Sequence, residues 1–403
     1  PGTGPGQTPG PHFGGSGASR PQPRSLKSAA RFQRRRTGPS LFDDEPDRGE
    51  PDPSPPPSPA PVAAAPVARD ADPHVAAGEK GKARDILDAV RALKAVEAGG
   101  REATADERAT LARFPGFGPV ALSLFPNPTS GRYKDAGWQA LGEDLRAILT
   151  ADEYASAKRT TFTAFYTAPV VADALYAALA RLGTPPDALV LEPGCGAGSF
   201  LARAAPGLRF VGVEQDSLSG RIAKARFPAH DVRIEGFQDS RLPDGGFDAV
   251  VGNVPFADLK LEHRGRKLAL HDYFLAKSID ALAPGGVMAV VTSHFTLDKQ
   301  NTAAREYLAD RADFLGAIRL PSDAFKREGT AVVTDLVFFR KRIPGEPARH
   351  ADPDWLATDT VDVDGAAVTV NRYFRARPQM VLGTLSRKDT LYADGYSVVS
   401  TGD

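Results

Sequence analysis

The sequence predicts an α/β fold, Rossmann-like in arrangement, with a mostly parallel sheet covered by helices on both faces. Segments with strand and helix patterns alternate from residue 167 to residue 342, and such alternation is typical of parallel strands joined by crossover helices. Three glycines, Gly194, Gly196 and Gly198, stand where the first strand leads into the next helix. Glycine there lets the backbone approach a ligand closely, so we expect a binding site at this turn.

The individual elements follow from hydrophobic periodicity and from the residues that bound each segment. We expect strands at 188–192, 209–214, 231–235, 247–252, 286–292, 314–319 and 331–339. We expect a first helix at 80–98 and a second helix that begins after the N-cap candidate Thr104. Further helices are expected at 137–157, 169–182, 198–205, 217–226, 272–282 and 301–310. The run at 331–339 is rich in β-branched and aromatic residues, which favour strands. A hairpin is expected at 359–370, around Asp364-Gly365.

Four regions differ in composition. Residues 1–78 are rich in Pro, Gly and Arg and poor in large apolar residues, which predicts a disordered tail. We expect residues 79–160 to form a helical cap and residues 161–342 to form the sheet domain. Residues 343–403 predict an extension or linker toward a downstream region, because the chain stops abruptly after Asp403 and we expect a fragment of a longer polypeptide.

The composition excludes several classes of protein. The 50 basic and 50 acidic side chains balance, which argues against a protein that coats nucleic acid non-specifically but allows a basic cleft. The single cysteine, Cys195, excludes an intramolecular disulfide and a cysteine-based zinc cluster, and the seven histidines are not spaced for a metal site. No apolar run approaches the roughly 18 residues of a membrane span. We therefore expect a cytoplasmic protein without a metal.

The strand that follows the glycine turn makes the interpretation of the turn more specific. A glycine-rich turn alone is weak evidence and equally suits a dinucleotide. The next strand ends at Glu214, which places a carboxylate where it can accept the protons of both ribose hydroxyls. The pair predicts a site for an adenosine-containing ligand, without identifying which one.

A third segment, at 235–240, follows the strand at 231–235. A carboxylate or amide there can bind an adenine amino group while an aromatic ring packs against the base. Phe237 is the candidate ring, and Asp239 or Gln238 is the candidate polar group. A plain loop after a strand is nearly as good an interpretation.

The tetrapeptide Asn253-Val254-Pro255-Phe256 ends the strand at 247–252 and carries the chemistry. An exocyclic amine is a poor nucleophile, because its lone pair is delocalised into the ring. Two acceptors on its two hydrogens free that lone pair for attack on a methyl donor. The Asn253 side chain and the main-chain carbonyl of Val254 can supply them, Phe256 can stack on a base flipped from the duplex, and Pro255 stiffens the turn.

These motifs together resemble amino-group DNA methyltransferases. The order, with Tyr166-Thr167 before the glycine loop, looks like the gamma arrangement of N6-adenine enzymes. The resemblance implies a class I S-adenosylmethionine-dependent methyltransferase fold with a mixed seven-strand sheet. It also implies that Tyr166 and Thr167 help to hold the methionine end of S-adenosylmethionine. The remaining residues of the cofactor motif are Glu192, Pro193, Gly194, Gly196, Gly198 and Phe200.

From about residue 80 onward the chain is also similar to the methyltransferase part of large phage- and plasmid-borne methyltransferase–helicase fusion proteins. The segments that carry this likeness are 271–274, 284–287, 317–321 and 329–335. The chain contains no phosphate-binding motif of a helicase, so a helicase region would lie beyond Asp403. One departure is Val254, where the family usually has proline, but the contact needed there is a main-chain carbonyl.

A basic stretch, 260–267, follows the tetrapeptide directly. A basic loop there would face DNA phosphate, with a solvated loop as an equally good interpretation. The candidate DNA-binding residues are Lys260, Arg264, Arg266 and Lys267. His271, at the start of the next predicted helix, suits a cap as well as a catalyst.

The leading prediction is a site-specific DNA methyltransferase that modifies adenine N6 of a flipped base in duplex DNA. N4-cytosine methylation uses the same two-acceptor chemistry and remains open. Methylation of an RNA base or of a protein glutamine amide is a second alternative, since those enzymes share a similar turn. A third, from a different class, is a non-catalytic DNA-binding module of a defence or antirestriction protein.

Overall fold

The computed structural model describes residues 75–76, 78–159, 167–325, 332–349, 353–388, 390 and 395–401. The chain divides into two units, Pro1–Ala64 and Ala65–Asp403, and all of the described residues belong to the second. The tail predicted at 1–78 therefore lies outside the described residues, apart from 75, 76 and 78.

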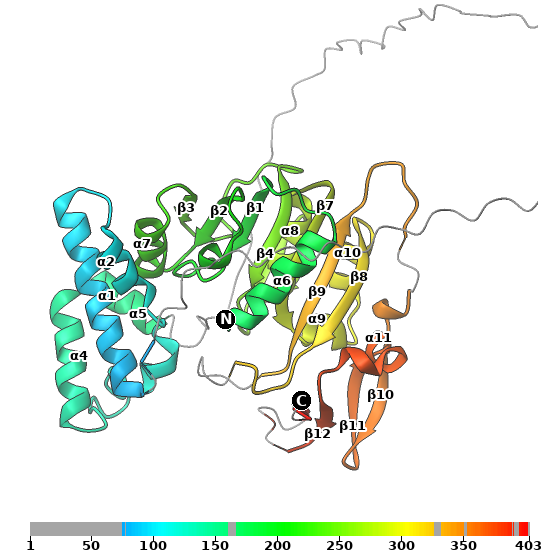
Figure 1. Ribbon diagram of the computed structural model, residues 1–403. Coiled ribbons are helices and arrows are strands. Elements are labelled where there is room, and N and C mark those ends of the chain that lie inside the picture. Colours follow the sequence, from blue (N-terminus) through cyan, green and yellow to red (C-terminus); the bar gives the residue numbers. More distant parts are fainter. Residues whose placement is uncertain are drawn as a thin grey trace, which may run out of the picture. The chain divides into compact units, whose positions relative to one another are not determined.

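A seven-stranded mixed sheet forms the centre of the sheet domain (Figure 1). Its strand order is β3-β2-β1-β4-β7-β9-β8. The first five strands of that order are parallel, and β9 runs antiparallel to both of its neighbours. This is the predicted sheet, with the β-branched run forming β9 between β7 and β8. The strands are β1 (Leu189–Pro193), β2 (Arg209–Glu214), β3 (Asp231–Ile234), β4 (Phe247–Asn253), β7 (Leu282–Ser293), β8 (Ala312–Arg319) and β9 (Thr334–Lys341).

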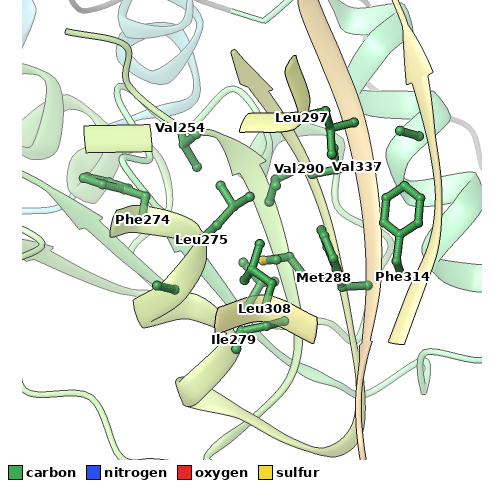
Figure 2. Packing of buried hydrophobic residues seen from close by; sticks show 14 of the residues in the cluster. Val254, Phe274, Leu275, Ile279, Met288, Val290, Leu297, Leu308, Phe314 and Val337 are labelled. Carbon is green, nitrogen blue, oxygen red and sulfur yellow. The ribbon is translucent and has the colours of Figure 1, made fainter. Parts of the chain in front are cut away.

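Helices cover both faces of this sheet. Alternate strand residues point to opposite faces, and Val190 joins an apolar core with α6 whereas Leu191 joins a second core with α8. Figure 2 shows part of the second core, in which Leu275 and Ile279 of α8 pack near Met288 and Val290 of β7. The helices of the domain are α6 (Pro169–Arg181), α7 (Ser217–Arg226), α8 (Leu270–Ala281), α9 (Phe295–Asp298) and α10 (Ala303–Ala309).

One predicted helix is largely missing. The segment expected to be helical at 198–205 contains only a short 3₁₀ helix, Leu201–Arg203. The φ angles of Gly194, Gly196 and Gly198 are 76°, 55° and 83°. Backbone in this left-handed region cannot begin a right-handed helix, so the turn continues further than the sequence pattern indicated.

The cap consists of α1 (Glu79–Gly99), α2 (Ala105–Ala112), α3 (Ala121–Leu124), α4 (Ala136–Ile148) and α5 (Ala151–Arg159). Thr104 caps α2 as predicted, in a reciprocal capping box with Glu107. The helix expected at 137–157 is instead divided into α4 and α5. The reason is a second capping box: the Thr150 hydroxyl accepts from Glu153 N, and a Glu153 carboxylate oxygen accepts from Thr150 N.

The extension after residue 342 is folded within its described part. The expected hairpin forms from β10 (Thr358–Val363) and β11 (Ala366–Asn371). Its turn residues Asp364 and Gly365 have φ angles of 51° and 81°. Trp355 and Tyr373 join the core that contains Phe339 of β9, so this part packs on the sheet. Its other elements are α11 (Arg372–Ala376), β12 (Thr384–Ser386) and β13 (Ser397–Val399).

The basic stretch after the tetrapeptide is a β-hairpin and not a loop. Strand β5 (Lys260–His263) pairs with β6 (Arg266–Ala269). Arg264 and Gly265 form the turn, with φ angles of 48° and 77°. Each strand has only four residues, too short for alternation to be recognised in the sequence.

Across the described part of the chain, no helix is both long enough and apolar enough to cross a bilayer.

Candidate cofactor and base site

A cavity of about 340 Å³ lies at the carboxyl edge of β1, β2 and β4. Side chains at the carboxyl ends of parallel strands meet at one edge of a sheet, which is where ligands bind in open α/β folds. The cavity brings together most of the residues predicted from the sequence. These are Thr167, Glu192, Gly194, Gly196, Phe200, Glu214, Phe237, Asn253, Val254, Pro255 and Phe256.

Glu214 ends β2 and is held by the glycine turn. One of its carboxylate oxygens accepts from Gly196 N at 2.8 Å, and the other accepts from Asp216 N at 2.7 Å. Burial raises the pKa of Glu214 to about 7, although both hydrogen bonds oppose the shift. Each oxygen retains a second lone pair, so the carboxylate can still accept from a ribose hydroxyl.

Glu192 lies in the same cavity, at the end of β1. Its side chain is fully buried, and burial together with the nearby charge of Glu214 raises its pKa well above the ordinary value. Its Oε2 atom has no hydrogen-bond partner among the described residues. Two buried carboxyl groups, one with an unused acceptor, make a site that fits a cationic ligand.

The tetrapeptide lies beside the glycine turn in the same cavity, since a Cβ on Gly194 would lie 3.8 Å from Pro255 Cδ. Asn253 is the last residue of β4, and its Oδ1 atom is buried. Val254 N donates to Val291 O at 3.1 Å. The Val254 side chain is 2% exposed and joins the apolar core in Figure 2, so valine contributes packing while its main chain follows the strand. The ring of Phe256 lies 6.4 Å from that of His271 in an edge-to-face contact.

Four predicted cofactor residues within the described part of the chain do not line the cavity. Pro193 and Gly198 do not line it; a Cβ on Gly198 would lie 2.6 Å from the Phe227 ring, so that glycine serves close packing. Gln238 and Asp239 are exposed, and the Gln238 amide donates to the Asp239 carboxylate at 2.8 Å. Tyr166 lies outside the described residues.

The four basic candidates divide into two pairs on the β5–β6 hairpin. Arg264 forms ion pairs with Asp244 at 2.7 Å and Asp280 at 2.9 Å. Arg266 lies over the Tyr307 ring, 5.5 Å from its centroid. Lys260 and Lys267 are exposed, and the strand pairing places them on the face opposite Arg266.

The sequence did not predict the contribution of the cap. Ser156 of α5 lines the cavity and donates to Asp216 Oδ1 at 3.0 Å. Asp216 in turn caps α7 by accepting from Ser219 N at 2.9 Å. No local pattern links residues sixty positions apart, so this contact was not detectable from the sequence.

His271, the predicted cap or catalyst, and a second histidine, His294, are both buried outside the lining of the cavity. His271 does not cap α8, because Ala269 occupies the N-cap position. Burial lowers the pKa of His271. Burial also lowers the pKa of His294 to about 4, and its Nδ1 donates to Val333 O at 3.0 Å.

Comparison with known proteins identifies the family. Residues 148–352 match the family model described as N-6 DNA Methylase, which is just over half of the 403 residues. The chain belongs to the N-6 DNA methylase family. S-adenosylmethionine is accordingly its cofactor, as the motifs predicted, and the seven-stranded sheet is that of class I S-adenosylmethionine-dependent methyltransferases.

The chain is similar to individual known proteins over different shares of its length. "Defense against restriction protein B" of Escherichia phage P1 is 34% identical over 166 residues, which are 39% of this chain and 7% of that protein. A tRNA (guanine-N(7)-)-methyltransferase of Geobacter metallireducens is 36% identical over 109 residues, 24% of this chain and 51% of that protein. The chain thus spans about half or less of these two relatives. The methyltransferase subunit of a type I restriction-modification system from Streptococcus thermophilus is similar in structure, with a TM-score of 0.39 and 18% identity over 64% of this chain and 66% of that one.

The cavity fits this cofactor. S-adenosylmethionine carries positive charge on its sulfonium and ammonium groups, and the buried carboxyl groups of Glu192 and Glu214 at the cavity would ionise beside such a cation. We expect Glu214 to hold the ribose, and the glycine turn to approach the ligand through its backbone.

Proposed function

We propose that this chain transfers a methyl group from S-adenosylmethionine to N6 of an adenine flipped out of duplex DNA. The observation that carries the proposal is that Asn253-Val254-Pro255-Phe256 opens into the same cavity as Glu192 and Glu214. The order of the motifs, with Thr167 before the glycine turn, supports a gamma-type enzyme.

The protein's part in the reaction is to position and polarise the amino group. Asn253 Oδ1 and the main-chain carbonyl of Val254 each accept one amino hydrogen, which localises the nitrogen lone pair. When bound, S-adenosylmethionine supplies an electrophilic methyl group. The hydrogen bond from Val254 N to Val291 O fixes the turn, so the acceptors are in place before the base arrives. Phe256 stacks on the extruded base.

DNA is the proposed partner, and the exposed Lys260 and Lys267 support a phosphate contact beside the tetrapeptide. Arg264 and Arg266 would act indirectly, by holding the hairpin that carries these lysines. We also propose that the chain belongs to a methyltransferase–helicase fusion protein of the cytoplasm. The similarity to the phage P1 protein, of which this chain spans 7%, supports membership in a much larger polypeptide.

The first experiment measures transfer of a tritiated methyl group to duplex DNA by the full-length protein. Asn253→Ala should lower kcat by about 100-fold, because one of the two fixed acceptors is lost, while the Kd for S-adenosylmethionine changes by less than about twofold. Asn301→Ala, at an exposed asparagine away from the cavity, is the matched control and should behave like the wild type.

The products then separate the alternatives. Digestion of methylated DNA to nucleosides should give N6-methyladenine, whereas N4-methylcytosine would assign the other amino-group reaction. Transfer to RNA or to a protein amide, and not to DNA, would contradict the proposed substrate. Cofactor binding without transfer to any of these would identify a non-catalytic module, and full activity of Asn253→Ala would refute the two-acceptor mechanism.

A further inference from the structure

Phe237 lies in a tight loop that forms one wall of the cavity. The loop closes on itself, since Asp239 N and Ser240 N both donate to Gly236 O, at 2.9 and 3.1 Å. The Ser240 hydroxyl donates to Phe237 O at 2.8 Å. Phe237 is 3% exposed, and its ring lies 4.6 Å from that of Phe274 on α8.

Lys277, one turn after Phe274 on α8, reaches the same loop. Its ammonium donates to Phe237 O at 2.5 Å and to Ser240 O at 2.9 Å, with a longer contact of 3.4 Å to Gln238 O. The same nitrogen lies 5.0 Å from the centroid of the Phe237 ring. An ammonium group has three donors and no acceptor, so three carbonyls at one loop match its bonding capacity.

The environment of Lys277 is unlike that of a surface lysine. Burial lowers its pKa, while the nearby carboxylates of Asp239 and Glu235 oppose that shift. Both of those residues belong to the segment that holds Phe237. A half-buried ammonium is retained at a cost in desolvation, and here it adds hydrogen bonds from α8 to the 236–240 loop.

We propose that Lys277 is a positioning residue for the adenine-binding wall of the cofactor cavity. It fixes the carbonyls of the 236–240 loop, Phe274 fixes the ring of Phe237, and together they hold that ring in place before the cofactor binds. The inference rests on the proposed use of this cavity by S-adenosylmethionine. It assigns to α8 a part in cofactor affinity that none of the sequence motifs contained.

The test is a binding titration of the full-length protein, with S-adenosylhomocysteine and with 5′-methylthioadenosine as probes. Lys277→Met keeps the apolar stem and removes the three donors. It should weaken both probes by a similar factor of about 10, because both contain the adenine ring and only one contains the amino-acid end. In methyl transfer, the KM for S-adenosylmethionine should rise by the same factor with kcat changed less than about twofold.

Lys341→Met is the matched control, because Lys341 also donates a partly buried ammonium to a carbonyl of α8, Ile279 O at 2.8 Å, away from the cavity. This control should lose stability without losing affinity for either probe. If Lys277→Met does not fold, Lys277→Gln retains a shorter donor and should show a smaller loss of the same kind. Wild-type affinity in a folded Lys277 variant would overturn the inference. Failure of the wild-type protein to bind either probe would instead contradict the proposed function.

Discussion

At the scale of single residues, Glu192 and Glu214 make the cavity suited to a positively charged ligand. Both are buried, and they face one space. Folding brings two carboxyl groups out of water and beside each other, which favours their protonated forms. A cationic ligand would reverse that preference.

This arrangement predicts a pH-dependent stability in the absence of cofactor. The folded pKa of Glu214 is about 7 against an ordinary value of 4.5. The folded state therefore binds more protons than the unfolded state between these values, so stability falls as pH rises through them. The contribution of Glu214 should decrease by about 2 kcal/mol from pH 5 to pH 7. Urea unfolding at pH 5, 6 and 7 gives the free energy of unfolding of wild type and of Glu214→Gln. The difference between the two proteins at each pH is the contribution of Glu214.

Glu192 remains in that variant, so part of the pH dependence should persist. Identical slopes for the two proteins would show that Glu214 does not titrate in this window.

The site residues that could be predicted from the sequence are those that lie at the ends of predicted strands. Glu214 and Asn253 each follow a β-branched run, and the edge of a parallel sheet brings such positions together. Gln238 and Asp239 show a limit of that reasoning, because they are exposed and of the three only Phe237 lines the cavity; their contact with the adenine amino group stays a prediction. Ser156 illustrates the other limit, since its contact arises from tertiary packing alone.

At the scale of elements, α7 connects the sheet domain to the cap. Arg221 of α7 donates to Glu97 of α1 at 2.6 Å and to Glu153 of α5 at 2.5 Å. Lys94 of α1 also donates to Glu153, at 2.6 Å. One guanidinium thus joins two cap helices to the helix that follows Glu214, and α5 carries Ser156 into the cavity.

Removing this connection should loosen the cap. Arg221→Met leaves Glu153 with Lys94 but deprives Glu97 of its partner, and we expect a loss of about 1–2 kcal/mol, reduced by the partial exposure of these groups. Amide hydrogen exchange should accelerate in α5 more than in β1 or β4. Arg101→Met, which breaks an ion pair with Glu107 inside the cap, should not change exchange in α5. Equal protection of α5 in wild type and Arg221→Met would contradict this role.

Elements with strong periodicity were predicted nearly to their ends, as with β2 at 209–214 and α7 at 217–226. The division of α4 from α5 was missed although Thr150 and Glu153 have the spacing of a capping box, because apolar periodicity continues across the break. The β5–β6 hairpin was missed for a different reason. Its strands have only four residues each, and the face with Leu261 and Leu268 also carries His263 and the exposed Arg266, so no hydrophobic alternation is recognisable.

At the scale of the whole described unit, a buried charge cluster ties the extension to the sheet. Arg319 of β8 is 0% exposed and forms paired hydrogen bonds with Asp335 of β9, both at 2.8 Å. It also bonds Asp298 of α9 at 2.9 Å. Tyr396, far along the chain, donates to the same Asp298 at 2.5 Å. These bonds join the extension, which was predicted as a linker, to β8 and β9. The first residue of β9, Thr334, lines the cavity.

This cluster should dominate the stability of the unit. Arg319→Met leaves two buried carboxylates without their cation, which costs about 3–5 kcal/mol. Arg340→Met is the comparison on β9, because among the described residues Arg340 donates to the backbone carbonyls of Gly285 and Leu182 and to no carboxylate, and its loss should cost about 1–2 kcal/mol. Urea unfolding of both variants gives the two values. Similar losses would mean that the cluster contributes no more than an ordinary buried arginine.

Helix α8 has twelve residues and contacts two residues that line the cavity, Phe256 and Phe237. In its first turn His271 meets the ring of Phe256, and further along Phe274 and Lys277 hold Phe237. A ligand that displaces this helix at one end changes the free energy of binding at the other, and thermodynamic linkage makes the effect equal in both directions. Cofactor and nucleic acid would thus sense each other's presence through α8, even at positions where the two ligands never touch.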